Sequence, residues 1–155
     1  MTEYSGQPRP VGRIAILVAR YNQVVTAKLL DGALACCGEA GIEPGHVDVI
    51  WVPGAFELGA AAAVAAATGH YACLIALGCV VRGETPHFEF VAAEAARGLS
   101  SVAVSHGLPI GFGVLTVDTL EQALARAGGD AGDKGREAAD AALRTADVLQ
   151  RLARR

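Results

Sequence analysis

The chain has few aromatic residues and no long apolar stretch. Aromatic residues make up 5% of its 155 residues, whereas apolar residues make up 52% and glycine contributes 19 residues. The longest apolar run, Leu58 to Thr68, is alanine-rich and too short to cross a bilayer. These proportions predict one domain in which small side chains let helices pack closely on a sheet, with further surface buried between subunits.

A basic excess and a targeting segment are also missing. The formal net charge is −3, which argues against a general nucleic-acid binder because such proteins normally present a basic face. The first twelve residues, Met1 to Gly12, are polar and show no signal peptide. We therefore expect a cytoplasmic protein that partners neither nucleic acid nor membrane.

The sequence lacks several motifs that are typical of redox-active cysteine pairs, metal sites and nucleotide-binding loops. The four cysteines form no C-x-x-C pair, and the adjacent Cys36 and Cys37 cannot easily pair with each other, so buried free thiols in a reducing cytosol are expected. No metal-ligand spacing occurs. Neither a G-x-G-x-x-G loop nor a Walker A loop is present.

What the chain does have is a regular alternation of strand and helix patterns. Short apolar runs predict four buried parallel strands at 13–19, 47–52, 71–81 and 110–115. Helical periodicity or composition predicts helices at 24–40, 55–67, 88–105, 119–127 and 138–154. Leu34 and Leu152 are expected to face inward, and residues 128–135 are expected to form a flexible loop.

This alternation predicts an α/β fold. We expect a flavodoxin-like three-layer sandwich with a four-stranded parallel sheet, right-handed crossovers and helices on both faces. Residues 13–155 form the domain. Residues 1–12 form an N-terminal arm that cannot be helical because it contains Pro8 and Pro10.

Distinctive residues follow each of the first three predicted strands. Tyr21 and Asn22 follow the first, the segment Pro53–Glu57 follows the second, and the segment Arg82–His87 follows the third. Ligands of open α/β sheets bind outside the carboxyl ends of the strands, so a site is expected there. Backbone amides near Glu84 and Thr85 can face an anion at the incoming helix, and a histidine can move protons near neutral pH.

Considered one at a time, most of the candidate site residues also have an ordinary structural interpretation. Tyr21 and Phe56 can be packing residues, His87 a structural histidine, and Arg126 and Lys134 solvated charges. Arg82 is either a phosphate ligand or a partner of Glu89. Cys79 is read as inert packing rather than as a nucleophile.

Four segments together resemble the lumazine synthases, enzymes of riboflavin synthesis. Residues 78–91, GCVVRGETPHFEFV, are similar to that family's G-x-V-I-R-G-x-T-x-H-[FY]-[DE]-[YF]-V. Residues 53–57 match P-G-A-[FI]-E, and the segment 120–135, LEQALARAGGDAGDKG, contains E-Q-A-x-x-R-A-G-x-x-x-x-x-K-G from Glu121 onward. Residues 20–22 resemble the family's Arg-Phe-Asn turn. The resemblance covers the chain from Arg13 to its end.

The resemblance implies a role for each matching position. Tyr21, where the family has Phe or Trp, stacks on a pyrimidine ring, and Asn22 hydrogen-bonds that ring. Other implied substrate contacts are the ribityl-binding Ala55, Phe56 and Glu57, and the pyrimidine-facing backbone of Cys79, Val80 and Val81. Gly59 stands where the family usually has proline.

The remaining implied roles concern catalysis and phosphate. His87 is the catalytic proton shuttle. Arg126, donated by an adjacent subunit, binds phosphate together with the amides of Glu84 and Thr85. Phe112 closes the pocket from the adjacent subunit, and Lys134 is a near neighbour of the site with an electrostatic role.

The implied reaction is the penultimate step of riboflavin biosynthesis. It condenses 5-amino-6-(D-ribitylamino)uracil with 3,4-dihydroxy-2-butanone 4-phosphate to give 6,7-dimethyl-8-ribityllumazine, phosphate and water, and it uses no cofactor or metal. The family assembles as ring pentamers. The short loop 128–135 resembles that of members forming sixty-subunit shells, so a shell is expected, with a free pentamer as the alternative and riboflavin synthase as a further partner.

Two other functions are compatible with a fold of this class. A flavodoxin-type electron carrier requires a Ser/Thr/Gly-rich phosphate loop after the first strand, and residues 19–23 contain none. A catalytically weak flavin-binding or shell-forming paralogue stays open, supported only by the departures at Tyr21 and Gly59.

Overall fold

The computed structural model describes residues 1–154, so Arg155, the last residue of the expected domain, lies outside the described residues. A four-stranded sheet forms its middle layer, in the order β2-β1-β3-β4 with every neighbouring pair parallel. The strands are β1 (Ile14–Ala19), β2 (Val47–Val52), β3 (Cys73–Val81) and β4 (Ile110–Val117). The central β1 and β3 are the most apolar because both of their faces are covered.

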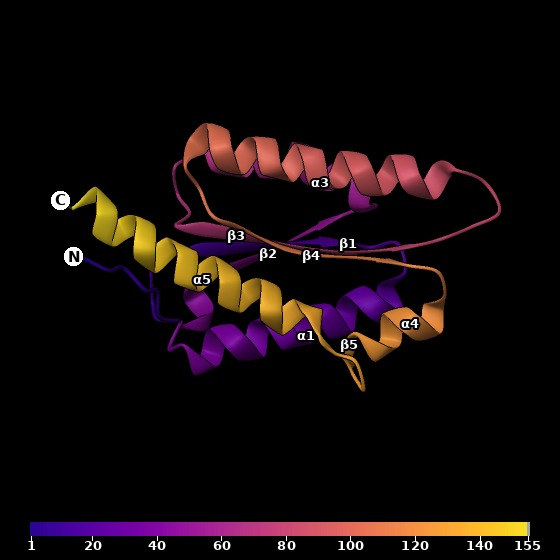
Figure 1. Ribbon diagram of the computed structural model, residues 1–155, viewed down its shortest axis with the longest axis horizontal. Coiled ribbons are helices and arrows are strands. Elements are labelled where there is room, and N and C mark those ends of the chain that lie inside the picture. The colour runs from indigo at the N-terminus through magenta and orange to yellow at the C-terminus, as the bar shows by residue number, and fades with distance from the viewer. Residues whose placement is uncertain (155) are drawn as a thin grey trace.

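Helices cover both faces of this sheet, as Figure 1 shows. The helices are α1 (Gln23–Glu39), α2 (Leu58–Ala67), α3 (His87–His106), α4 (Leu120–Ala125) and α5 (Lys134–Ala153). One face carries α2 and α3, and the other carries α1, α4 and α5. The expected flavodoxin-like three-layer α/β fold is therefore confirmed.

Strand residues divide between two cores according to the two-residue period of a strand. Ile16 and Ile75 face the core beneath α1 and α5, whereas Leu17 and Leu74 face the core beneath α2 and α3, and all four are fully buried. The shared register, with Ile16 beside Ile75, aligns the carboxyl ends of the strands at one edge.

The prediction of a flexible loop at 128–135 is wrong. Residues Ala127–Gly129 (β5) and Gly132–Asp133 (β6) form a small antiparallel hairpin, and α5 begins at Lys134 rather than at Ala138. The Asp133 side chain caps α5 by accepting a hydrogen bond from the Arg136 backbone N–H. Gly135 fits in the first turn because a Cβ there would lie 2.0 Å from the Leu29 carbonyl oxygen.

Two inward-facing leucines were also wrongly expected. Leu34 is 38% exposed because the buried side of α1 runs through Leu29, Ala33 and Cys37, and Leu152 is 47% exposed near the end of α5. The helix expected from Ala55 begins instead with a 3-10 turn, Ala55–Glu57 (η2), and a second such turn, Pro44–His46 (η1), precedes β2.

The N-terminal arm lies along α5 of its own chain without forming a strand or helix. Asp147, only 4% exposed, accepts hydrogen bonds from the Gln7 backbone N–H at 2.9 Å and from Arg9 Nε at 2.5 Å. Gln150 Nε2 donates to the Val11 carbonyl at 2.8 Å. Within residues 1–154, no helix has the length and apolarity needed to cross a membrane.

Candidate active site

A cavity of about 720 Å³ opens at the carboxyl ends of β1, β2 and β3. Three connecting segments and the first turn of α3 line it. The lining residues are Tyr21, Pro53, Gly54, Ala55, Phe56, Glu57, Cys79, Val80, Val81, Gly83, Thr85, His87, Phe88, Phe90 and Val91. The structure therefore brings nine of the predicted site residues together around one space.

The turn after β1 places an aromatic ring at this cavity. Asn22 has a left-handed backbone with φ 61°, a conformation that asparagine tolerates better than most residues, and its side-chain Nδ2 donates to the Cys79 carbonyl oxygen at 2.9 Å. The Tyr21 N–H donates to the Pro53 carbonyl at 2.9 Å. The turn is thus tied to β3 and to the segment after β2. Tyr21 is 74% exposed, which excludes its reading as a packing residue.

The η2 turn after β2 provides a second aromatic ring and a carboxylate. Ala55 is buried and anchors the turn, whereas Phe56 is 61% exposed and is therefore not a core residue. The Glu57 N–H donates to the Gly54 carbonyl at 3.2 Å, and Glu57 immediately precedes α2. Hence Phe56 and Glu57 both stand at the cavity on a short, hydrogen-bonded turn.

The segment after β3 leads into the amino end of α3, where His87 is the first helical residue. Gly83, Thr85 and His87 line the cavity, while Glu84 lies exposed in the same loop and its side chain does not. The positive end of the helix dipole therefore faces this loop, which favours an anion there.

Sequence reasoning missed residues of α3 that line this cavity. Phe90 and Val91 line the cavity, and Phe90 is 68% exposed. Their spacing of three and four residues from His87 puts all three side chains on one face of α3, a signal that was available in the sequence.

Arg82, for which two roles were open, is engaged in ion pairs. Its Nε lies 2.9 Å from Asp118 Oδ1, and its Nη1 lies 3.5 Å from Glu89 Oε1. The hydrogen bond with Asp118 raises the pKa of the guanidinium above its usual value. The guanidinium also lies 4.6 Å from the centre of the Phe88 ring. Arg82 therefore braces the loop between β3 and α3.

Cys79 does not have the character of a nucleophile. The residue is 3% exposed, and burial raises the pKa of its thiol to about 11. The neutral thiol thus predominates near pH 7, where a nucleophile would need to be a thiolate. All four cysteines are buried and free, as expected.

Three predicted site residues lie away from this cavity. Phe112 is on β4, 40% exposed, beside Leu99 and Ala103 of α3. Arg126 and Lys134 line a separate cavity of about 370 Å³. A single copy of the chain therefore surrounds the main cavity with aromatic, carboxylate and imidazole groups, and none of the arginines among residues 1–154 lines it. Among residues 1–154, no group of three or more His, Cys, Asp or Glu side chains is arranged to hold a metal ion.

The fold and the cavity define an α/β protein of flavodoxin-like architecture with a cavity at the strand ends, where ligands of open α/β sheets bind. Comparison with known proteins narrows this class. The model of the 6,7-dimethyl-8-ribityllumazine synthase family matches residues 12–150. The chain therefore belongs to the 6,7-dimethyl-8-ribityllumazine synthase family.

Individual relatives agree with the family match. The 6,7-dimethyl-8-ribityllumazine synthase of Gemmatimonas aurantiaca is 46% identical over 152 residues, which cover 97% of this chain and 93% of the relative. The proteins of the same name from Yersinia pestis and Yersinia pseudotuberculosis are each 48% identical over 144 residues, covering 92% of both chains. Neither the family match nor these relatives support a weak flavin-binding or shell-forming paralogue.

Proposed function

We propose that this chain is a transferase that condenses 5-amino-6-(D-ribitylamino)uracil with 3,4-dihydroxy-2-butanone 4-phosphate. The products are 6,7-dimethyl-8-ribityllumazine, phosphate and water. The observation that carries the proposal is the strand-end cavity, where Tyr21, Glu57 and His87 converge from three separate segments. The relatives that share nearly the whole chain carry the name of this activity.

The ribitylaminouracil is held by the groups after β1, β2 and β3. The exposed rings of Tyr21 and Phe56 offer faces for a planar heterocycle. The backbone around Ala55 and the Glu57 carboxylate receive the ribityl hydroxyls, because a polyol needs hydrogen-bond partners on a fixed turn. The backbone of Cys79, Val80 and Val81 meets the pyrimidine edge. Asn22, whose Nδ2 already binds the Cys79 carbonyl, contributes its free carbonyl oxygen Oδ1.

His87 serves the proton transfers of imine formation, phosphate elimination and ring closure. General acid–base groups of this kind contribute roughly 10²–10⁴-fold. The leaving phosphate is bound by the amides of Glu84 and Thr85 at the amino end of α3, together with Arg126 from a neighbouring copy. Arginine suits this role because its planar fork can donate two hydrogen bonds to a phosphate.

The complete site requires a second copy of the chain. Phe112, Arg126 and Lys134 are placed on the neighbour's side of the site, consistent with their distance from the cavity lining of their own chain. The assembly is a ring pentamer, twelve of which form a sixty-subunit shell in the cytoplasm, with riboflavin synthase as a further partner. The shortness of segment 128–135, which is folded into the β5–β6 hairpin, supports the shell through its resemblance to shell-forming members. A pentamer mass by light scattering at neutral pH would contradict it.

A turnover assay tests the proposed function. Purified protein is mixed with both substrates, and lumazine absorbance is followed above the spontaneous rate. Arg126→Ala should reduce the catalysed rate on the order of 10³-fold, because it removes a donor that stabilises developing charge. His87→Ala should reduce it less, by about 10²-fold. A spontaneous rate from correctly assembled wild-type protein would reject the proposal.

A further inference from the structure

Arg126 and Lys134 lie at the two ends of one small hairpin. Arg126 follows α4, β5 and β6 come next, and Lys134 begins α5. The Lys134 N–H donates to the Arg126 carbonyl at 2.8 Å, so the two backbones adjoin, and both side chains line the cavity of about 370 Å³. Glu137 lines it too, so two cations face one carboxylate there. The hairpin thus presents the two cations as a pair.

Asp133 is the residue at which this hairpin meets two helices. It pairs with Ala127 across the hairpin, and its Oδ1 accepts a hydrogen bond from the Arg136 N–H at 3.1 Å. Its carboxylate lies against the buried Gly32 of α1, where an added Cβ would be 2.4 Å from both oxygens. Asp133 does not line the cavity of the two cations. Its side chain therefore fixes the hairpin without being a ligand.

We propose that Asp133 is a positioning residue that sets the placement of Arg126 and Lys134 toward the phosphate of the second substrate. This inference rests on the proposed function. Asp133 directly precedes Lys134, and its strand pairing adjoins the Lys134–Arg126 backbone bond, so a shift of Asp133 moves both cations. The close fit of the Asp133 carboxylate over Gly32 holds the hairpin in place, and with it the backbone that carries the two cationic side chains.

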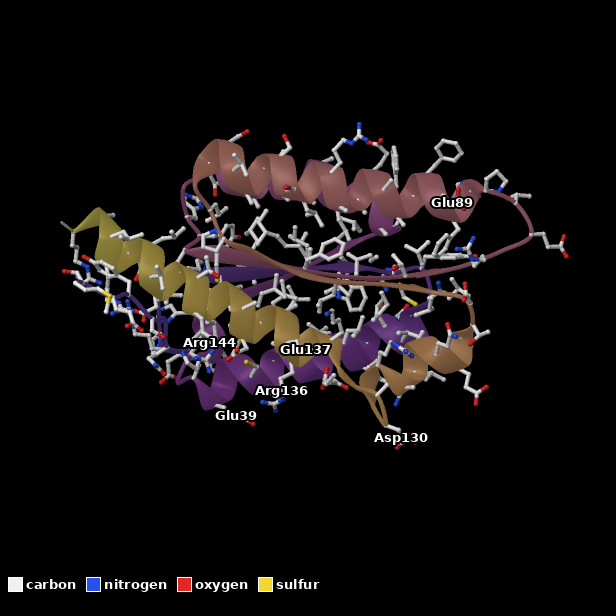
Figure 2. All side chains as sticks on the ribbon, in the orientation of Figure 1. Glu39, Glu89, Asp130, Arg136, Glu137 and Arg144 are labelled. Carbon is white, nitrogen blue, oxygen red and sulfur yellow. The ribbon has the colours of Figure 1, made fainter. Side chains whose placement is uncertain are left out.

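The test separates the KM values of the two substrates. Asp133→Ala should raise KM for the butanone phosphate by roughly tenfold and leave KM for the ribitylaminouracil unchanged. This increase lies within the ~10²-fold that a misplacement of about 1 Å can cost. The separate variant Asp133→Asn should keep the wild-type KM for the butanone phosphate, because asparagine caps helices about as well as aspartate. Asp140→Ala is the matched control, since Asp140 lies on α5, the helix that Asp133 caps, but pairs with Arg144 (labelled in Figure 2) at 2.7 Å.

Gly32→Ala provides an independent variant. The added methyl group pushes against the Asp133 carboxylate, so it should raise the same KM, and combining it with Asp133→Ala should add nothing further because the opposing group is gone. Equal changes in both KM values, additive effects, or failure of Asp133→Asn to rescue would overturn the inference. If correctly assembled wild-type protein shows no turnover above the spontaneous rate, the proposed function fails instead.

Discussion

Exposed aromatic rings mark the site at the scale of single residues. The chain has eight aromatic residues: one Trp, three Tyr and four Phe. Tyr21, Phe56 and Phe90 are each more than 60% exposed, and all three border the same cavity. Exposed apolar patches mark surfaces that bind a partner chain or a ligand, and the shared position of these rings at a cavity favours a ligand with an apolar face.

Tyr21 should affect binding rather than folding. Tyr21→Ala should raise KM for the ribitylaminouracil by roughly 5- to 150-fold, the range expected for losing the ~1–3 kcal/mol of one base-stacking contact. Tyr21→Phe, which keeps the ring, is the control and should stay close to wild type. Thermal unfolding should be unchanged in both because the side chain is 74% exposed. Equal KM values for Tyr21→Ala and wild type would show that no stacking occurs.

Cys79 should be dispensable for chemistry. Because burial raises the pKa of its thiol to about 11, native protein at pH 7.5 should not be alkylated at Cys79 by iodoacetamide, as mass spectrometry can check. Cys79→Ala should lower stability by about 1 kcal/mol through lost packing and leave kcat within about twofold. Rapid alkylation, or loss of turnover in stable Cys79→Ala protein, would contradict this reading.

Some residue roles could be predicted from the sequence and others could not. The placement of Tyr21, Glu57 and His87 follows from short-range rules, since each comes just after a recognisable strand. The role of Arg82 could not be decided, because its strongest partner, Asp118, is 36 positions away at the end of β4. Only the folded sheet brings those two strand ends together.

At the scale of elements, the strands could be predicted from local sequence patterns, whereas the β5–β6 hairpin could not. The strands were predicted within a few residues because their apolar runs are local. The β5–β6 hairpin was missed because its pattern is glycine-rich and resembles a flexible loop. What orders it comes from elsewhere: Asp133 lies against Gly32 of α1, and Gly135 lies against Leu29. Those contacts join segments about a hundred residues apart, which no local pattern reveals.

The N-terminal arm should be released at low pH. Two hydrogen bonds lower the pKa of the Asp147 carboxyl group. The larger effect comes from the Gln7 backbone N–H and the next from the Arg9 side chain. A lowered folded pKa means that this stabilisation is fully present above the unfolded value of about 3.9 and is lost as the pH falls through the folded value. Hydrogen exchange at Gln7 should therefore be slow at neutral pH and should accelerate beyond its intrinsic pH dependence once the pH drops below that range.

A substitution separates this contact from general acid unfolding. Asp147→Ala, which removes the acceptor, should lose protection at Gln7 at neutral pH, while core amides of β1 and β3 stay protected. Asp118→Ala is the control, because Asp118 pairs with Arg82 far from the arm. Undiminished protection at Gln7 in Asp147→Ala would show that other contacts hold the arm.

At the scale of the whole molecule, the residues of the proposed site are divided between separate surfaces of one copy of the chain. The strand-end cavity holds Tyr21, Glu57 and His87, while Phe112 and the Arg126–Lys134 pair lie on other surfaces. Strand and helix patterns could predict the first group. The second group was predicted only from family resemblance, because an exposed arginine or phenylalanine looks the same in sequence whether or not a neighbour uses it.

Mixed assemblies test the composite site most directly. Subunits carrying His87→Ala and subunits carrying Arg126→Ala are each assembled alone and then together, with mixing verified by native mass spectrometry. In a mixed ring, some cavities receive an intact His87 from one copy and an intact Arg126 from its neighbour. Turnover should therefore reappear at a fraction of the wild-type rate, well above either parent. No recovery in verified mixed rings would contradict a site shared between copies.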